Sequence, residues 1–159
     1  MGACGRAAGP PEPGTVRAVL VRPPHDTVRF TAPAMARRCG RGAGVLVEGI
    51  VGGNGVLLWA RSGDSSVIGD FPPITRGDST TPRGAMASFR FMLGEDARGV
   101  TFDSGSVMLT RSDGRQALEA QVRGSGLEPV AGQRVRLEAT FAAVPLAPAS
   151  DTASCTVRL

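Results

Sequence analysis

Apolar and polar residues alternate along several stretches of the chain, with the period of two that is typical of β-strands. Residues 134–141 show it most clearly, because the apolar side chains occupy every second position there. These positions are Val135, Leu137, Ala139 and Phe141. Residues 118–123 and 87–93 have the same alternation. Strands with one apolar and one polar face are typical of antiparallel sheets, so the pattern predicts such a sheet.

Turn signals separate these runs. Residues 52–55 (Gly-Gly-Asn-Gly) and 112–114 (Ser-Asp-Gly) predict two hairpins, since Gly supplies the positive φ that tight hairpin turns require. A third hairpin tip is expected at residues 94–96. The Gly-rich stretch 124–132 is expected to link the last two long strands.

Further strands are expected along the rest of the chain, for a total of about eight to ten. They lie at residues 16–22, 28–32, 45–50, 56–61, 67–68, 106–111 and 115–123. Helix signals are weak: residues 32–40 are compatible with a turn or a short helix that has Pro33 near its start. The chain is therefore expected to be all-β.

These elements predict an antiparallel β-sandwich, or a flattened barrel, over residues 15–159. A length of 159 residues suits one domain. Residues 1–14 contain the stretch GRAAGPPEPG, a composition typical of a tether, and are expected to form a flexible tail. No apolar run approaches the ~20 residues that a membrane-spanning helix needs.

Trp59 lies in a run that is apolar on both faces, with Leu57 on its own side and Val56, Leu58 and Ala60 on the other. Two apolar faces indicate a central strand that is covered on both sides. We expect Trp59 to lie in the core. The alternative is that its face of the sheet contacts a partner.

The positive charge comes from Arg alone. All 18 basic residues are Arg, and the formal net charge is +4. Complete absence of Lys indicates codon bias in a GC-rich, bacterial genome rather than selection for phosphate contacts, in which both residues serve. The Arg residues are spread along the chain, with one local cluster at Arg37, Arg38 and Arg41, and only seven aromatic residues are available for base stacking. We expect a solvated surface and no nucleic-acid partner.

Cys39 and Cys155 are too far apart in sequence for a zinc or redox pair, and neither has a partner at Cys-x-x-Cys spacing. We expect a Cys39–Cys155 disulfide that pins the last segment of the chain to the domain, which would indicate an oxidising compartment. The alternative is a pair of buried thiols in a cytosolic protein.

Cys4 follows Gly2 and Ala3, a small-residue pair of the kind that precedes the lipidated Cys of bacterial lipoproteins. The basic and apolar regions of such a signal do not precede it here. One interpretation is that Cys4 is the mature, lipidated N-terminus of a chain whose start was placed too late or trimmed. The other is a chance match in a tail rich in Gly, Ala and Arg.

No catalytic or metal-binding constellation is expected, and no cofactor. The single histidine, His25, lies in a loop-like Pro-Pro-His-Asp stretch with no sign of a nucleophile partner. Glu48, Glu119 and Glu138 occupy polar positions of expected strands, which are usually a solvated face rather than a pair of catalytic carboxylates. The tripeptide Arg76-Gly77-Asp78 matches an adhesion motif, yet it arises easily by chance in a chain so rich in Arg and Gly.

Three segments resemble small uncharacterised bacterial lipoproteins of β-sandwich type. The first is the Leu58-Trp59 strand followed by the Gly-Asp-Phe-Pro turn at 69–72. The second is the strand DSGSVMLT at 103–110, and the third is RLEATF at 136–141 with Val144-Pro145 after it, where Ala139 stands in place of the usual Gly. This resemblance implies export and a sandwich fold. It transfers no catalytic or binding residue.

The function expected from these observations is that of a non-enzymatic domain, exported or lipid-anchored in the cell envelope. Its partner would be a protein or glycan at the cell surface, and it would contact the membrane only through a lipid anchor. Two alternatives stay open. A small barrel that carries an apolar ligand would need an internal cavity, and a cytosolic or phage-like structural subunit would need a long unpaired edge strand or a large apolar patch.

Overall fold

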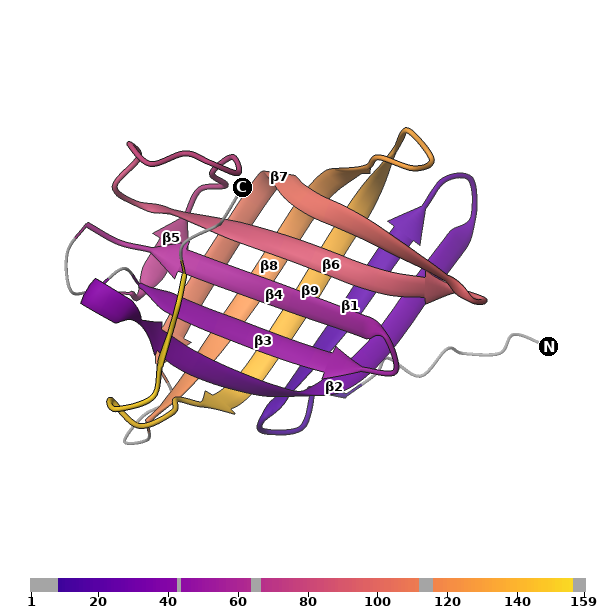
Figure 1. The fold of residues 1–159 in the computed structure, drawn as a ribbon. Helices are drawn as coiled ribbons and strands as arrows, with labels where there is room; N and C mark the ends of the chain where they lie inside the picture. The colour runs from indigo at the N-terminus through magenta and orange to yellow at the C-terminus, as the bar shows by residue number, and fades with distance from the viewer. Residues whose placement is uncertain (1–8, 43, 64–66, 112–115, 156–159) are drawn as a thin grey trace.

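The computed structural model describes residues 9–42, 44–63, 67–111 and 116–155, and these residues form an all-β fold, as the alternation predicted (Figure 1). Eight strands make up its body: β1 (Thr15–Arg22), β2 (Asp26–Cys39), β3 (Val45–Val51), β4 (Asn54–Arg61), β6 (Gly84–Leu93), β7 (Asp96–Arg111), β8 (Ala117–Glu128) and β9 (Gln133–Pro145). Two short strands, β5 (Gly69–Phe71) and β10 (Thr152–Ala153), and the 3₁₀ turn η1 (Gly40–Gly42) complete it. The described residues include no helix that is long and apolar enough to span a membrane.

The eight long strands close into a barrel. Each pairs antiparallel with its neighbour in the order β1-β9-β8-β7-β6-β4-β3-β2, and β1 pairs with β2 as well. Ala18 therefore has a partner on each side, Phe30 on β2 and Ala139 on β9. Of the two forms expected from the sequence, the sheet adopts the closed one, and closure removes the exposed edges of an open sheet.

The barrel interior is filled by side chains. All six Phe residues of the chain are buried in one contiguous apolar cluster: Phe30, Phe71, Phe89, Phe91, Phe102 and Phe141. Small residues such as Ala18, Ala87 and Ala139 face them from other strands and are also buried. Large and small side chains thus share the interior of this small barrel, as close packing requires.

The two short strands cover places where long strands separate. β6 pairs with β7 only between residues 88–93 and 96–101, and farther along β7 the partner is β5, with Phe71 opposite Val107. Arg83 fastens β5, because its guanidinium donates to the carbonyl oxygens of Ile68 (2.8 Å) and Asp70 (3.0 Å) and lies 4.0 Å from the centre of the Phe71 ring. The second place is beyond Pro33, where β2 no longer pairs with β1, and there β10 pairs in parallel with the end of β2.

Two details of the sequence prediction are wrong. Residues 32–39 form no helix but belong to β2, with Ala32, Ala34 and Ala36 buried as alternate residues of the strand, and a short 3₁₀ turn begins only at Gly40. Residues 124–126 form no turn but continue β8, and the turn lies at 129–132. Gly124 fits there because β7 passes so close that an added Cβ would lie 1.9 Å from the carbonyl oxygen of Ser104.

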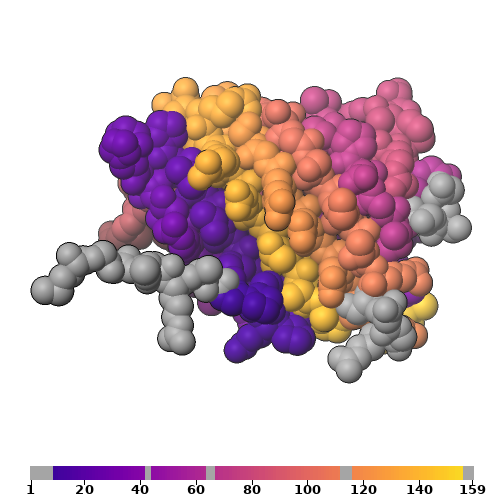
Figure 2. All heavy atoms as spheres, turned by 180° about the vertical axis from the view of Figure 1, so that it is seen from behind, coloured from indigo at the N-terminus to yellow at the C-terminus, as the bar shows by residue number. Residues whose placement is uncertain are grey.

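The described part of the N-terminal tail lies against the barrel. Gly14 donates a backbone hydrogen bond to Ala142 (2.7 Å) and accepts one from Ala34 (2.8 Å). Pro10, Pro11 and Pro13 line a groove with outward side chains of β7, β8 and β9, the face seen in Figure 2. Cys4, residues 112–115 and the final segment 156–159 lie outside the described residues.

A buried ion pair closes one end of the barrel. Glu128 is fully buried at the end of β8, and the Arg22 guanidinium donates to both of its carboxylate oxygens, at 2.9 and 3.1 Å. Gln133 donates a third hydrogen bond to this carboxylate (3.1 Å), and Arg22 also bonds Asp26 (2.6 Å). The hydrogen bonds from Arg22 hold the pKa of Glu128 below its ordinary value, although burial acts in the opposite direction.

We expect this pair to make the stability of the barrel depend on pH in the acidic range. Because the folded-state pKa of Glu128 is lowered from 4.5, its stabilisation is complete above pH 4.5 and is lost as the pH falls through the lower folded-state pKa. Urea unfolding of wild type and Glu128→Gln between pH 7 and pH 2.5 measures this contribution. The wild type should lose more free energy of unfolding than the variant, and parallel pH profiles would contradict the assignment. Exposed Glu138→Gln is the matched control.

Candidate functional site

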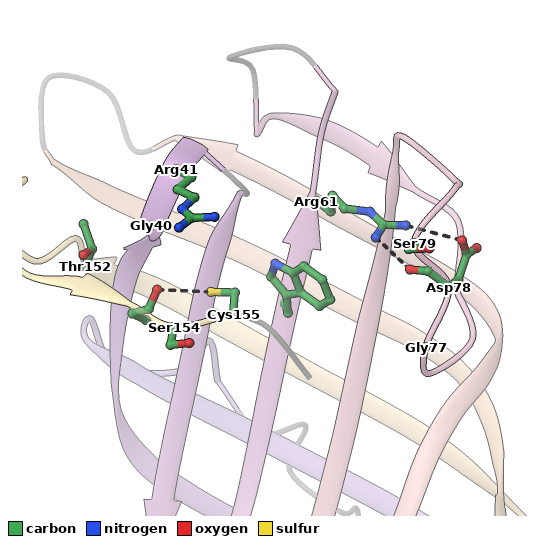
Figure 3. A pocket seen from close by; sticks show the side chains of 11 residues that line it. Gly40, Arg41, Arg61, Gly77, Asp78, Ser79, Thr152, Ser154 and Cys155 are labelled. Carbon is green, nitrogen blue, oxygen red and sulfur yellow. Dashed lines mark hydrogen bonds and ion pairs between the residues drawn. The ribbon is translucent and has the colours of Figure 1, made fainter. Parts of the chain in front are cut away.

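A hollow lies on the outside of the barrel, at the end of β4. It is a cleft of about 750 Å³ (Figure 3). Its floor is the outer face of β4, and its walls are the turn η1, the loop at residues 77–79 and the C-terminal segment at residues 152–155. The lining residues are Gly40, Arg41, Trp59, Arg61, Gly77, Asp78, Ser79, Thr152, Ala153, Ser154 and Cys155.

Trp59 lies on the floor of this cleft and not in the core. Leu58 and Ala60 point into the barrel and are fully buried, so alternation turns Trp59 outward, where it is partly exposed. Along the outer face it has Leu46 of β3 on one side and Met86 of β6 on the other. The expectation of a core tryptophan is therefore wrong, because both faces of β4 carry apolar residues and only the other face lines the barrel interior.

Arg61 and Asp78 join the floor to the loop wall. The Arg61 Nη1 atom donates to the backbone oxygen of Asp78 at 2.8 Å, and Nη2 lies 3.7 Å from its Oδ1 (Figure 3). The Arg61 guanidinium also lies 5.6 Å from the ring centre of Trp59, within cation–π range. Its buried Nε and Nη2 atoms have no hydrogen-bond partner within the described residues. The carboxylate thus only partly satisfies this guanidinium.

The Asp78 carboxylate is held by its own loop. Its Oδ1 accepts hydrogen bonds from the backbone N–H groups of Thr80 (2.8 Å) and Thr81 (2.9 Å), and the Thr81 hydroxyl donates to Oδ2. These bonds, led by the one from the Thr81 hydroxyl, hold the pKa of Asp78 far below its ordinary value. The side chain of this Arg-Gly-Asp tripeptide is thus engaged with its own molecule, which does not suit an adhesion motif that must present its carboxylate to a receptor.

The C-terminal wall is attached by the disulfide that the sequence predicted. Cys39 and Cys155 are bonded, with their Cα atoms 5.5 Å apart. The chain reaches this point along β2: Ala147 donates a backbone hydrogen bond to Ala36 (2.7 Å), and β10 places Thr152 beside Arg38 and Ala153 beside Cys39. β10 is only two residues long and contributes few hydrogen bonds. The Cys39–Cys155 disulfide is therefore the main attachment of residues 152–155 to the barrel.

Arg41 stands on the wall formed by η1. Its backbone has a φ of 61°, and its side chain is exposed. Figure 3 shows its guanidinium directed toward the cleft. Within the described part of the chain, Arg41 makes no hydrogen bond or ion pair. The described residues thus bring to the cleft one cation without a partner among them, one partly paired cation, one carboxylate, an indole ring and several hydroxyl groups.

The other candidate residues lie elsewhere. His25 is exposed in the turn between β1 and β2, and Glu48 is paired with Arg37 on the outer wall (2.6 Å). Glu119 and Glu138 are exposed on β8 and β9. Across the described ranges, no three His, Cys, Asp or Glu side chains come together as metal ligands would. The sequence analysis missed the pairing of Arg61 with Asp78. The alternation along β4, which places Trp59 and Arg61 on the same face of the strand, was the one signal that could have indicated this site.

Fold and cleft define the class to which this chain belongs: a closed, eight-stranded antiparallel β-barrel with a filled interior and an external cleft. Comparison with known proteins adds no relative, because no family model, curated protein or solved structure matches the chain.

We expect Trp59 fluorescence to report the charge of this cleft directly, since the chain contains one Trp and no Tyr. Iodide is an anion and acrylamide is neutral, so the ratio of their quenching constants reports the local charge. At low salt this ratio should be roughly twofold higher in the wild type than in Arg41→Gln. Arg29→Gln, an exposed substitution on the first half of β2, should leave the ratio unchanged. An equal ratio in wild type and Arg41→Gln would show that Arg41 does not act on the cleft.

Proposed function

We propose that this protein is a non-enzymatic binding module that acts outside the cytosol, in the cell envelope or as a secreted domain, and that its recognition site is the cleft over β4. The observation that carries the proposal is the disulfide-held wall. Cys155 lines the cleft and its bridge to Cys39 attaches the segment 152–155 to the barrel. A site whose wall depends on a disulfide suits an oxidising compartment.

Binding suits the cleft better than catalysis. Among the described residues that line it, the only carboxylate is that of Asp78, whose pKa is so low that it stays ionised at neutral pH, so it has no proton to donate and is a poor proton acceptor. The other charged groups in the described lining are two guanidinium ions, which hold anions well but exchange no protons at neutral pH. Indole, hydroxyl and guanidinium groups around a partly apolar hollow are typical of a site that orients a ligand.

The two alternatives have less support. A carrier of an apolar ligand would use the barrel interior, which six Phe side chains and their neighbours occupy. A structural subunit that assembles through strand pairing would need a long unpaired edge, whereas the long strands described here close on themselves.

Fractionation of the native cells tests the proposed location. Cells are separated into cytosol, envelope and medium, and the protein in each fraction is measured with an antibody against the barrel. We expect the protein in the envelope or the medium, together with a secreted marker. Recovery with a cytosolic marker would overturn the proposal.

A further inference from the structure

The charges of the cleft favour an anionic ligand. The described lining of the cleft holds two guanidinium groups, those of Arg41 and Arg61, and one carboxylate, that of Asp78, which already accepts hydrogen bonds from Thr80 and Thr81. Arg41 keeps its full donor capacity within the described residues. A guanidinium with its donors available binds a carboxylate through two parallel N–H···O bonds, which is a stronger and more directional contact than a neutral hydrogen bond.

The floor and the remaining walls favour a sugar ring beside that anion. Trp59 offers a partly exposed aromatic surface on which the C–H face of a pyranose can stack, and aromatic rings are large contact surfaces of defined geometry. Ser79, Thr152 and Ser154 place hydroxyl groups around it. A volume of about 750 Å³ lies in the usual range for small-ligand sites and accommodates more than one sugar ring.

We propose that the cleft binds an acidic saccharide, with its carboxylate on Arg41 and a sugar ring against Trp59. This inference rests on the proposed function and specifies its ligand. A peptide with a terminal carboxylate would use the same cation. It fits less well, because the described lining residues beside Trp59 are Gly, Ala, Cys155, hydroxyl-bearing and charged residues, and none of these is a large apolar side chain that would hold a peptide anchor.

Titration of the oxidised protein with trigalacturonic acid tests this assignment, with Trp59 fluorescence as the signal. The trimethyl ester of the same trisaccharide is the matched neutral probe, because it keeps the rings and loses the charge. We expect saturable quenching or a spectral shift with the acid, and an affinity at least about tenfold weaker with the ester, as expected for loss of a charge-assisted contact. Equal affinities for acid and ester, or no response to the acid at millimolar concentration, would overturn the assignment.

Three variants separate the roles of the residues. Arg41→Gln should weaken the acid at least about tenfold and leave the ester nearly unchanged, whereas Arg29→Gln should change neither. Trp59→Ala, followed by calorimetry because its fluorescence is lost, should weaken both probes. An Arg41→Gln protein that binds the acid as tightly as wild type would overturn the role of Arg41.

A further probe distinguishes failure of this inference from failure of the proposed function. N-acetyl-diglycine carries a carboxylate without a sugar ring. If this peptide binds the cleft more tightly than trigalacturonic acid does, the saccharide assignment is overturned, while the proposal of a binding cleft still stands. Recovery of the protein from the cytosol, by contrast, would overturn the proposed function whatever the titrations show.

Discussion

Replacement of Glu128 by Gln should destabilise the barrel by about 3–5 kcal/mol, the usual cost of removing one partner of a buried ion pair. Glu128 is fully buried, and the Arg22 side chain is 12% exposed and donates to both carboxylate oxygens. Gln keeps the shape of the side chain but leaves the guanidinium with the exposed Asp26 as its remaining ion-pair partner. The measurement is the free energy of unfolding in urea at pH 7.

Two further variants show whether the ion pair itself is responsible. Arg22→Met combined with Glu128→Met removes both charges and should recover much of the loss, because a buried pair can often be replaced by apolar residues at little cost. Glu138→Gln, an exposed change on β9, should stay within about 0.5 kcal/mol of wild type. A Glu128→Gln protein as stable as the Glu138→Gln control would contradict the account of this barrel end.

Loss of the Cys39–Cys155 bridge is the second large effect. The two cysteines are 116 residues apart, and closing so long a loop stabilises a fold by ~4–5 kcal/mol in the chain-entropy model. The Cys39→Ser/Cys155→Ser protein should therefore unfold at a markedly lower urea concentration. Because the bridge also holds the segment 152–155, iodide and acrylamide should both reach Trp59 more readily in this variant.

The comparison needs a background that cannot exchange disulfides. Both proteins should carry Cys4→Ser, so that Cys39 and Cys155 are the only thiols that can pair. A reductant should lower the unfolding midpoint of the protein that retains this pair and leave the triple Ser variant unchanged. Reduction of folded protein also supplies the result if the triple variant fails to fold. Identical midpoints before and after reduction would show that the bridge does not stabilise the barrel.

Alternation predicted much of the barrel wall, because a buried strand face leaves a local signature. Val135, Leu137 and Phe141 were expected on one face of their strand, and all three are buried. The turn or short helix considered for residues 32–40 was a weaker signal, and it was wrong for the part that lies in β2, where Ala at every second position gives little apolar contrast. Closure is different: the contact between β1 and β9 joins residues more than a hundred positions apart, and no local pattern encodes it.

The cleft could not be predicted from the sequence for the same reason. Its parts come from η1, from β4, from the loop at 77–79 and from the segment 152–155, and they meet only after the barrel has formed. The Cys39–Cys155 pair was the one long-range element that the sequence offered, since cysteine counting restricts pairing without knowledge of the fold. Arg41 and Arg61 could not be singled out among 18 arginines spread along the chain.

The most direct test of this account is the state of Cys39 and Cys155 in protein taken from its native cells. Cells are lysed in an alkylating reagent that traps thiols, and the protein is cleaved after Arg without reduction. Residues 39–41 carry Cys39, and residues 137–158 carry Cys155. The account predicts one linked species of these two peptides, with neither cysteine alkylated. Two separate, alkylated peptides would contradict it. The disulfide would then be absent in the cell, and neither the attachment of residues 152–155 nor the oxidising compartment would stand.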